Sequence, residues 1–366
     1  MKVDGVPRRS IQLAADGETV EIVDQTGLPH RFETRRLATL EDAVAAIRDM
    51  QVRGAPLIGA TAAYGICFAV RDDPSAASIE RACAALLATR PTAVNLRWAL
   101  DDMKARTLAV DETRRAGAAY TRAAEICDED VAINAAIGEN GLDLLRSAAS
   151  GKAGPLDVLT HCNAGWLATV DGGTALAPIY CAHDAGIDVH VWVDETRPRN
   201  QGAGLTAWEL AAHGVPHTVI VDNAGGHLMR EGRVDLCITG TDRTCANGDV
   251  CNKIGTYLKA LAAADNEIPF YVALPGPTID WSAESGADLP IEERAGEEVS
   301  TVTGATESGE VRTVRLTPAA SPAFNPGFDV TPARLVTALI TERGVAEASA
   351  EGLLSLYPER RRAATG

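Results

Sequence analysis

The chain has 366 residues, of which 46% are hydrophobic, and a formal net charge of -16 at pH 7. It is longer than a usual single domain, and its apolar content is enough for two hydrophobic cores. The negative charge, which no Lys/Arg-rich stripe offsets, excludes nucleic acid and acidic membrane surfaces as expected partners.

The location and redox state of the protein follow from its ends and its cysteines. Residues 1–10 are polar and lack the apolar core of a signal peptide, and the longest apolar run, 56–70, contains glycines and is too short to cross a bilayer. The eight cysteines are scattered without close pairs, which is typical of free thiols in a reducing cytosol. Their spacing does not indicate a zinc site. We therefore expect a cytoplasmic protein that acts on a small molecule.

The first part of the chain predicts a small sheet followed by helices. Residues 11–23 alternate apolar and polar around residues 16–17, which predicts a β-hairpin, and residues 32–37 predict a third strand. Thr39 begins a capping sequence, and the apolar residues after it recur at helical spacing, at Ala43, Ile47 and Met50. Further helices are predicted at 59–70, 75–88, 93–109 and 113–147.

The second part predicts a parallel, doubly wound sheet. It begins after the turn-rich stretch 150–155, so we place one domain at residues 1–148 and another at 149–366. Short β-branched runs then alternate with helical patterns, at 156–160, 188–193, 218–221, 236–239 and 270–274. Residues 283–316 predict an excursion with one hairpin. A helix is predicted from Thr331, with Pro332 at its first position.

Four of the predicted strands run directly into polar clusters. These clusters are residues 160–165, 194–198, 222–226 and 241–243. Because the carboxyl ends of parallel strands border the ligand crevice, all four are expected at one edge of the sheet.

Asp242 is the strongest candidate for an acid or base in these clusters. We expect it at a strand-to-helix turn crowded by polar residues, namely Asn247, Asp249, Asn252 and Lys253. A carboxyl group in a partly dry crevice gains proton affinity, which suits proton transfer near neutral pH. Asp194 and Asp222 have a simpler interpretation, as helix caps or salt-bridge partners.

Cys162 follows a strand, and Gly165 opens space after it. A cysteine is commonly a small buried hydrophobic residue, but a helix amino terminus here favours a thiolate or an oxyanion. His161 is expected to point to the opposite face, so adjacency does not imply a Cys-His nucleophilic pair.

Phosphate binding has no Walker or Gly-x-Gly-x-x-Gly signature in this chain. Arg53 instead precedes exposed amides at Gly54 and Ala55 before a predicted helix, and Arg90 precedes a Pro-Thr helix start. The Arg53 segment or the Arg90 segment alone is typical of an ordinary helix start. Together with Lys253, the two arginines are able to hold one phosphate. Neutral hydrogen bonds to sugar hydroxyls are expected from residues just past Arg197-Pro198, at Gln201 and Gly202. The alternative for these two is a surface loop.

The same segments resemble the methylthioribose-1-phosphate isomerase family, which is related to the regulatory subunits of translation initiation factor two B. The resemblance covers residues 23–345 and is carried by RGAPLIGATAAYG at 53–65, RPTAVNL at 90–96, THCNAG at 160–165, VDETRP with QG at 193–202, GTDR with NGDVCNKIGT at 240–256, and NPGFDVTP at 325–332.

The resemblance implies an α/β fold, in which a small amino-terminal domain of sheet and helices precedes a Rossmann-like domain, and it implies homodimers. It implies an intramolecular oxidoreductase of methionine salvage, without metal or organic cofactor, that converts an aldose 1-phosphate into the ketose 1-phosphate. From the matching motifs, the resemblance implies that Asp242 is the catalytic acid and that Cys162 assists it. The implied substrate contacts are Arg53, Gly54, Ala55, Arg90, Gln201, Asn252 and Lys253.

The chain departs from the family pattern at a few positions around the sugar. Asp222-Asn223 is followed by Ala224-Gly225-Gly226, Thr241 replaces an alanine, and residues 274–277 differ from the usual sequence. Two alternatives therefore stay open. One is the same reaction on 5-deoxyribose 1-phosphate or ribose 1,5-bisphosphate, and the other is a non-catalytic, translation-factor-like protein that senses nucleotides.

Overall fold

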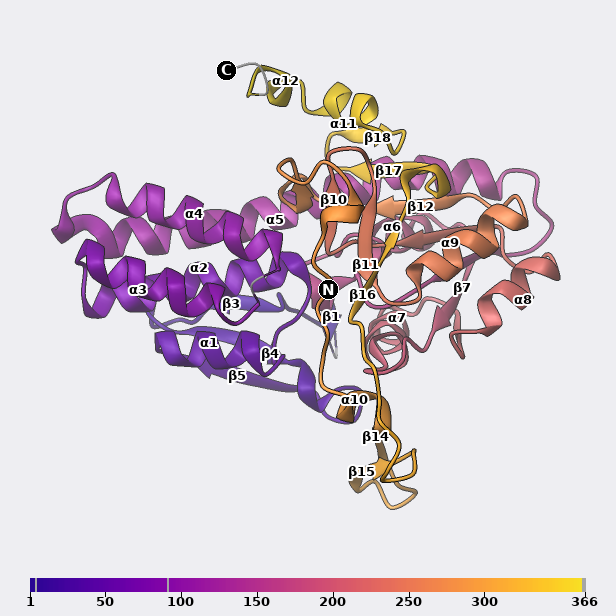
Figure 1. Cartoon of the computed structure of the whole chain (residues 1–366), viewed down its shortest axis with the longest axis horizontal. Coiled ribbons are helices and arrows are strands. Elements are labelled where there is room, and N and C mark those ends of the chain that lie inside the picture. Colours follow the sequence, from indigo (N-terminus) through magenta and orange to yellow (C-terminus); the bar gives the residue numbers. More distant parts are fainter. Residues whose placement is uncertain (4, 91, 364–366) are drawn as a thin grey trace.

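The computed structural model describes residues 1–3, 5–90 and 92–363. A part built from a small sheet and long helices lies beside a larger part with a central sheet (Figure 1). Pro91, in the predicted helix start after Arg90, lies outside the described residues. The structure is mixed α/β with a small amino-terminal β-rich region and a large parallel-sheet region, so the predicted fold class is confirmed.

The small amino-terminal sheet has three antiparallel strands in the order β3-β4-β5. They are β3 (Ile11–Leu13), β4 (Val20–Asp24) and β5 (Glu33–Leu37), after a short pair formed by β1 (Lys2–Val3) and β2 (Val6–Pro7). The predicted hairpin and third strand are thus confirmed. Asp16 fixes the hairpin turn, because its carboxylate accepts hydrogen bonds from the backbone N–H groups of Glu18 and Thr19.

Five helices follow this sheet, as the sequence predicts. They are α1 (Leu40–Arg48), α2 (Ala55–Asp72), α3 (Ala76–Leu87), α4 (Val94–Leu108) and α5 (Glu112–Ala149). Thr39 and Asp42 form a capping box at the start of α1. The helix ends at Arg48, and Met50 has a positive φ of 57°. The prediction that Met50 continues the helical face is therefore wrong.

Helix α5 packs on two hydrophobic cores of the molecule. It has 38 residues and a length of about 57 Å. Its amino-terminal half adds Ala119 and Ile126 to the core of the first part, whereas Ile137 and Leu145 belong to a core under the large sheet.

The large sheet has seven strands in the order β18-β17-β12-β9-β6-β7-β8. Its strands are β6 (Leu156–Thr160), β7 (Val189–Asp194), β8 (His217–Ile220), β9 (Leu236–Thr239), β12 (Phe270–Ala273), β17 (Ala338–Thr341) and β18 (Gly344–Ala346). The five predicted strands are present and parallel. Successive residues face opposite cores, as Val158 and Leu159 do, so helices cover both faces of the sheet.

Helices α6 (Leu176–Asp184), α7 (Ala207–His213), α8 (Ala224–Arg230) and α9 (Thr256–Asp265) connect the parallel strands. The C-terminal helices are α11 (Ala350–Leu356) and α12 (Glu359–Ala363). Among the described residues, no helix has both the length and the apolar character that crossing a bilayer requires.

A second, four-stranded sheet lies between the two parts and corrects two predictions. It contains β10 (Arg243–Cys245), β11 (Val250–Lys253), β13 (Ile279–Asp280) and β16 (Phe328–Thr331). Residues 243–253 therefore form a hairpin, and helix α9 begins only at Thr256. Thr331 does not begin a helix, because it pairs with Val250 in the ladder of this sheet. After Pro332 only a short 3-10 turn precedes strand β17.

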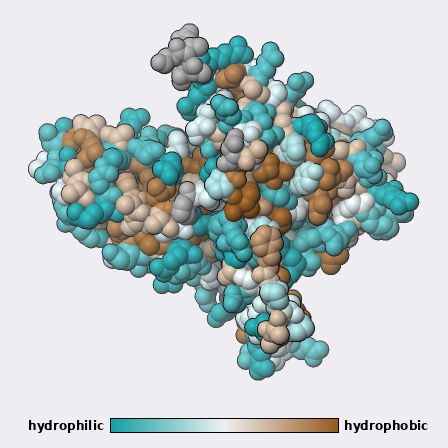
Figure 2. Space-filling model, in the orientation of Figure 1, coloured by the Kyte–Doolittle hydropathy of each residue, from teal (hydrophilic) through white to brown (hydrophobic). Residues whose placement is uncertain are grey.

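The predicted excursion contains the predicted hairpin, formed by β14 (Thr301–Ala305) and β15 (Val311–Arg315) after the short helix α10 (Glu297–Ser300). The hairpin projects from the body of the molecule (Figure 1). Hydrophilic residues cover most of the face in Figure 2, and hydrophobic residues gather near its middle.

Candidate active site

The four predicted polar clusters lie at one edge of the large sheet. Strands β6, β7, β8 and β9 are parallel neighbours, so the residues that follow them share the edge formed by the strands' carboxyl ends. This expectation is confirmed.

Cys162 lies in a tightly held loop directly after β6. Its φ is 66°, its backbone N–H donates to Thr196 Oγ1 at 2.8 Å, and its carbonyl oxygen accepts from Thr206 Oγ1 at 2.7 Å. The residue is 6% exposed. Backbone bonds on both sides therefore hold a non-glycine residue in a conformation that is rare for it.

Burial raises the pKa of the Cys162 thiol, and the positive charges of Arg53 and Lys253 oppose this rise only in part. The predicted helix amino terminus behind the thiol is absent among the described residues, because Gly165 leads only into a 3-10 turn at Trp166–Ala168. The prediction that a helix favours the thiolate is therefore wrong. The group is a protonated thiol at neutral pH.

Asp242 follows β9 and lines the same cavity as Cys162. This cavity has a volume of about 30 Å³, and Arg53, Ala55 and Asn252 also line it. The backbone N–H of Asp242 bonds to the carbonyl oxygen of Cys251 at 3.0 Å. No described residue donates a hydrogen bond to the Asp242 carboxylate, which leaves it open to a ligand.

Two residues expected to crowd Asp242 lie at the tip of the β10-β11 hairpin instead. Asn247 bonds to Asp249, and the Asp249 carboxylate accepts from the backbone N–H groups of Gly286 and Ala333. These bonds lower the pKa of Asp249, against the effect of burial. Both residues therefore stabilise the hairpin and its neighbouring loops, and the prediction that they share the turn of Asp242 is wrong.

Arg53 connects the first part of the chain to the loop that contains Cys162. Its Nη1 and Nη2 atoms donate to Asn163 Oδ1 at 2.5 Å and to the Asn163 carbonyl oxygen at 2.8 Å. Gly54 has a φ of 94°, and a Cβ there would lie 2.5 Å from the Ala168 backbone. Helix α2 then begins at Ala55. Only glycine therefore fits between Arg53 and this helix start.

Asn163 is held in turn by a buried carboxyl group on α7. The Asn163 side chain donates to Glu209, and the backbone N–H of Trp166 and the hydroxyl of Tyr180 also bond to Glu209. Burial raises the pKa of Glu209 to about 7 in spite of these bonds. No motif in the sequence indicates Glu209, because it lies inside a helical segment rather than after a strand.

Two further cations approach the cavity. Lys253 is 8% exposed, its Nζ donates to the Gly327 carbonyl oxygen at 2.8 Å, and burial lowers its pKa. Burial also lowers the pKa of Arg90, whose Nε atom has no hydrogen-bond partner among the described residues. Arg294 adds to both effects. Sequence analysis missed Arg294, which lies in the loop before α10 without any motif around it.

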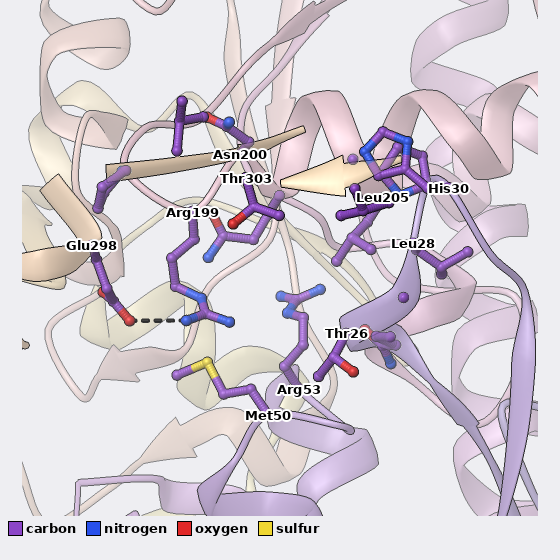
Figure 3. A pocket seen from close by; sticks show the side chains of 18 of the residues that line it. Thr26, Leu28, His30, Met50, Arg53, Arg199, Asn200, Leu205, Glu298 and Thr303 are labelled. Atoms are coloured by element: carbon purple, nitrogen blue, oxygen red, sulfur yellow. Dashed lines mark hydrogen bonds and ion pairs between the residues drawn. The ribbon is translucent and has the colours of Figure 1, made fainter. Parts of the chain in front are cut away.

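A larger cavity of about 340 Å³ opens on the other side of Arg53. Figure 3 shows Arg53 extending into it, with Arg199 and its ion-pair partner Glu298 at 2.9 Å opposite. Gln201 lines this cavity at the start of a π-helical turn, and its Oε1 atom is buried without a partner among the described residues. Orphaned polar atoms beside a cavity are typical of ligand sites.

The nine sequence-predicted residues thus come together. The cavity that holds Cys162 shares Arg53 with the larger cavity, and it shares Ala55 and Asp242 with a third. Eight of the nine residues line at least one of the three: Arg53, Gly54, Ala55, Arg90, Cys162, Gln201, Asp242 and Asn252. The ninth, Lys253, is close enough for Cys162 and Asp242 to affect its pKa. Their roles in binding and catalysis stay predictions.

Asp194 is the salt-bridge partner expected for it, whereas Asp222 holds a loop by backbone hydrogen bonds rather than capping a helix. Asp194 Oδ2 lies 3.1 Å from Lys259 Nζ, and Asp222 accepts from the backbone N–H groups of Thr196 and Arg197. With His161 they form the one group of metal-type ligands found in the described part of the chain, all within 4.8 Å of one another.

The chain is similar to known proteins along its whole length. The family described as "Initiation factor 2 subunit family" matches residues 51–348. The methylthioribose-1-phosphate isomerase of Methylorubrum extorquens is 65% identical over 365 residues, which is 100% of each chain. The isomerase of the same name from Paramagnetospirillum magneticum is 65% identical over 98% of this chain and 100% of its own.

Two solved structures share the fold. The 5-methylthioribose 1-phosphate isomerase of Pyrococcus horikoshii has a TM-score of 0.83 and 37% identity, with 96% of each chain covered. The structure named translation initiation factor eIF-2B, subunit delta, from A. fulgidus has a TM-score of 0.80 and 37% identity, with 96% of this chain and 100% of that chain covered.

Proposed function

We propose a function from one premise, that this chain belongs to the methylthioribose-1-phosphate isomerase family within the initiation factor 2 subunit family. The proposed activity is the conversion of 5-methylthioribose 1-phosphate into 5-methylthioribulose 1-phosphate, a step of methionine salvage. The observation that carries it is the shared cavity of Cys162 and Asp242, two groups that lie eighty positions apart in the sequence.

The phosphate is held by the cations around the cavity. Arg53, Arg90 and Lys253 supply positive charge, and the amides of Gly54 and Ala55 supply donors at the start of α2. Burial lowers the pKa of Arg90 and Lys253, because it disfavours their charged forms. A phosphate dianion beside them stabilises these charged forms. Asn252 and Gln201 contact the sugar.

Ring opening requires an acid, because the phosphate blocks the anomeric hydroxyl through which an ordinary aldose opens. Asp242 protonates the ring oxygen, and hydrogen then moves from carbon 2 to carbon 1. In the enolate pathway the Asp242 carboxylate, formed when Asp242 gives its proton to the ring oxygen, accepts the proton from carbon 2, and carbon 1 is then protonated. Since Cys162 is a thiol rather than a thiolate at neutral pH, it relays a proton or donates a hydrogen bond to the enolate oxygen. In the alternative pathway, hydrogen moves as a hydride in a site that excludes water.

The solvent isotope distinguishes these pathways. In deuterated water, solvent label on carbon 1 of the product excludes a purely internal hydride shift and supports the enolate pathway.

The activity is tested by side-by-side turnover of three sugars by the purified protein. We expect the largest kcat/KM with 5-methylthioribose 1-phosphate. The 5-deoxyribose analogue lacks the thioether, and ribose 1,5-bisphosphate needs further free cations near carbon 5. Arg199 lines the larger cavity and is paired with Glu298. A larger kcat/KM for either analogue would change the substrate but keep the reaction.

A second function is favoured by one observation, the 37% identity to the structure named initiation factor subunit delta. In that case the protein is a non-catalytic nucleotide sensor. Tight nucleotide binding without isomerase activity would support it. The 65% identity to proteins named as isomerases, together with Cys162 and Asp242, supports the enzyme.

The family resemblance further leads us to propose a cytoplasmic homodimer that needs no cofactor. Analytical ultracentrifugation checks the dimer, and activity after exhaustive chelation checks the independence from metal.

A further inference from the structure

His161 stands next to the candidate thiol, yet the proposed mechanism does not use it. Its side chain is fully buried. Nδ1 lies 2.9 Å from Asp194 Oδ2, and Nε2 lies 2.8 Å from the carbonyl oxygen of Ile254. A carbonyl oxygen and an ionised carboxylate only accept hydrogen bonds, so both ring nitrogens must donate. The ring is therefore an imidazolium.

Charged groups of both signs surround this ring. Asp194 on β7 faces Nδ1 directly, and Asp222 after β8 lies 3.9 Å from the same nitrogen. Lys259 on α9 bonds to Asp194 and to the backbone oxygen of Asp222. Asp329 on β16 is close enough to interact electrostatically with His161. Two cations thus face three carboxyl groups in a buried cluster, a setting that retains the charge on the ring.

A bound metal ion does not fit this cluster, although His161, Asp194 and Asp222 have ligand atoms within 4.8 Å of one another. Lys259 Nζ already lies 3.1 Å from Asp194 Oδ2, and a second cation there meets its repulsion. A metal on Nδ1 also requires that nitrogen to lose its proton. The lysine and the imidazolium already supply the positive charge that the carboxylates need.

His161 connects two segments of the candidate site. Its backbone continues directly into Cys162, and its Nε2–H holds the carbonyl group of Ile254, which follows Lys253. The ring also packs against Gly255, where an added Cβ would lie 2.9 Å from His161 Cε1. Gly255 has a φ of 103°. The orientation of the ring therefore determines where the turn after Lys253 lies.

We propose that His161 is a positioning residue that, as an imidazolium fixed by Asp194, holds the turn after Lys253 against the loop that contains Cys162. The distance between the candidate phosphate-binding ammonium and the candidate thiol depends on it. The substrate in this proposal rests on the proposed function, whereas the protonation of the ring does not.

Two substitutions distinguish between the two hydrogen bonds that the His161 ring makes. The amide nitrogen of glutamine reaches the position of Nε2, so His161→Gln keeps the bond to Ile254. That of asparagine reaches the position of Nδ1, so His161→Asn keeps only the bond to Asp194. We expect His161→Asn to raise KM about tenfold, because the turn after Lys253 loses its hydrogen bond. We expect KM of His161→Gln to stay within about threefold of the wild type, with kcat less affected than KM in both variants.

The same pair tests the proposal without catalysis. Inorganic phosphate is titrated into each folded variant and into the wild type, by calorimetry. The dissociation constant should rise in His161→Asn by the same factor as KM and stay near the wild-type value in His161→Gln. Equal losses in the two variants would overturn the positioning role, because a merely structural histidine tolerates neither change.

The wild-type protein tests the charge of the ring even if the variants fail to fold. In the ¹⁵N spectrum of histidine-labelled protein, one of the seven histidines should show two protonated ring nitrogens at neutral pH and above. Asp194→Asn should abolish this signature. The proposal is wrong if all histidines are neutral at about pH 8. If the imidazolium signature and the phosphate result hold but no sugar is isomerised, the proposed function fails and the positioning role stands.

Discussion

At the scale of single residues, the site combines groups whose charge states depend on burial. Burial keeps Cys162 protonated and lowers the pKa of Arg90 and Lys253. No described residue donates a hydrogen bond to the side chain of Asp242. A thiol that stays protonated is suited to give a proton rather than to attack as a nucleophile.

Substitution of the thiol tests this interpretation. We expect Cys162→Ser to lower kcat by roughly 10² to 10⁴, the usual contribution of a positioned proton donor. Because burial raises the pKa of the thiol, wild-type activity should fall only at alkaline pH, as the thiol ionises. This alkaline fall should be absent in the residual activity of Cys162→Ser. An unchanged pH profile in that variant would show that another group titrates.

The buried carboxyl of Glu209 gives a prediction on stability. Its folded-state pKa is about 7, above its ordinary value of 4.5, so the folded protein binds a proton that the unfolded chain releases. The resulting stabilisation is fully present below the ordinary pKa and is lost as the pH rises through about 7. Chemical denaturation should show that Glu209→Gln gains about 2 to 3 kcal/mol relative to the wild type between pH 4.5 and pH 7.5.

The exposed residue Glu41 on α1 provides the matched control. Glu41→Gln removes one carboxylate without any change in the buried network, so its stability should follow the wild-type curve at each pH. Asp130, whose pKa burial also raises to about 7, contributes equally to the wild type and to both variants. A constant difference between Glu209→Gln and the wild type would contradict the assignment.

At the scale of elements, strand ends and helix starts bring the side chains of the candidate site together. The parallel strands place Cys162 and Asp242 at one edge, and the start of α2 brings Arg53 against the loop after β6. The β10-β11 hairpin adds Lys253.

Gly54 controls the entry to α2 and gives the prediction at this scale. Gly54→Ala places a Cβ 2.5 Å from the Ala168 backbone at a positive φ, so we expect a loss of about 2 kcal/mol or more in unfolding free energy. Because Arg53 moves with Gly54, kcat/KM should fall at least tenfold, which is roughly the effect of losing one hydrogen bond to a charged group.

Gly117→Ala is the control, since it lies inside α5 with no atom within 4 Å of an added Cβ. It should gain about 0.5 to 1 kcal/mol and keep full activity. Similar effects of the two substitutions on kcat/KM would contradict the role given to Gly54.

The sequence predicts elements well where the local pattern is also the determinant of the structure. The alternation after residue 155 predicts the parallel strands, and Thr39 predicts the start of α1. The helix expected at Thr331 is absent because its pairing partner, Val250, is 81 residues away, and no local pattern records that pairing. The short strands of the hairpin at 243–253 also pair with β13 and β16, which lie far along the chain, so the sequence shows only a turn there.

Site residues are likewise predictable from the sequence only where the local pattern determines their position. Residues directly after predicted strands, such as Cys162 and Asp242, are identifiable from the chain. Glu209 and Arg294 act through contacts across the fold, and neither lies in a motif. The protonation of Cys162 also depends on tertiary burial, which is why the predicted helix effect was the wrong determinant.

At the scale of the whole molecule, the two parts share α5. The proposed boundary after residue 148 lies at the end of this helix, yet Ile137 and Leu145 are fully buried in the core under the large sheet. A fragment that begins at 149 lacks them. We expect fragment 149–366 to show no cooperative unfolding, whereas fragment 128–366 should unfold cooperatively by circular dichroism. Cooperative unfolding of the shorter fragment would show that α5 is dispensable for this core.

The central claim is that Asp242 acts as the acid on a sugar phosphate held beside Cys162. Its most direct test is the kcat of Asp242→Asn with 5-methylthioribose 1-phosphate, measured on protein whose thermal unfolding and phosphate affinity match the wild type. We predict a kcat reduced by roughly 10² to 10⁴, because the amide keeps the size of the side chain but has no acidic proton. Turnover near the wild-type rate by this folded variant would contradict the account.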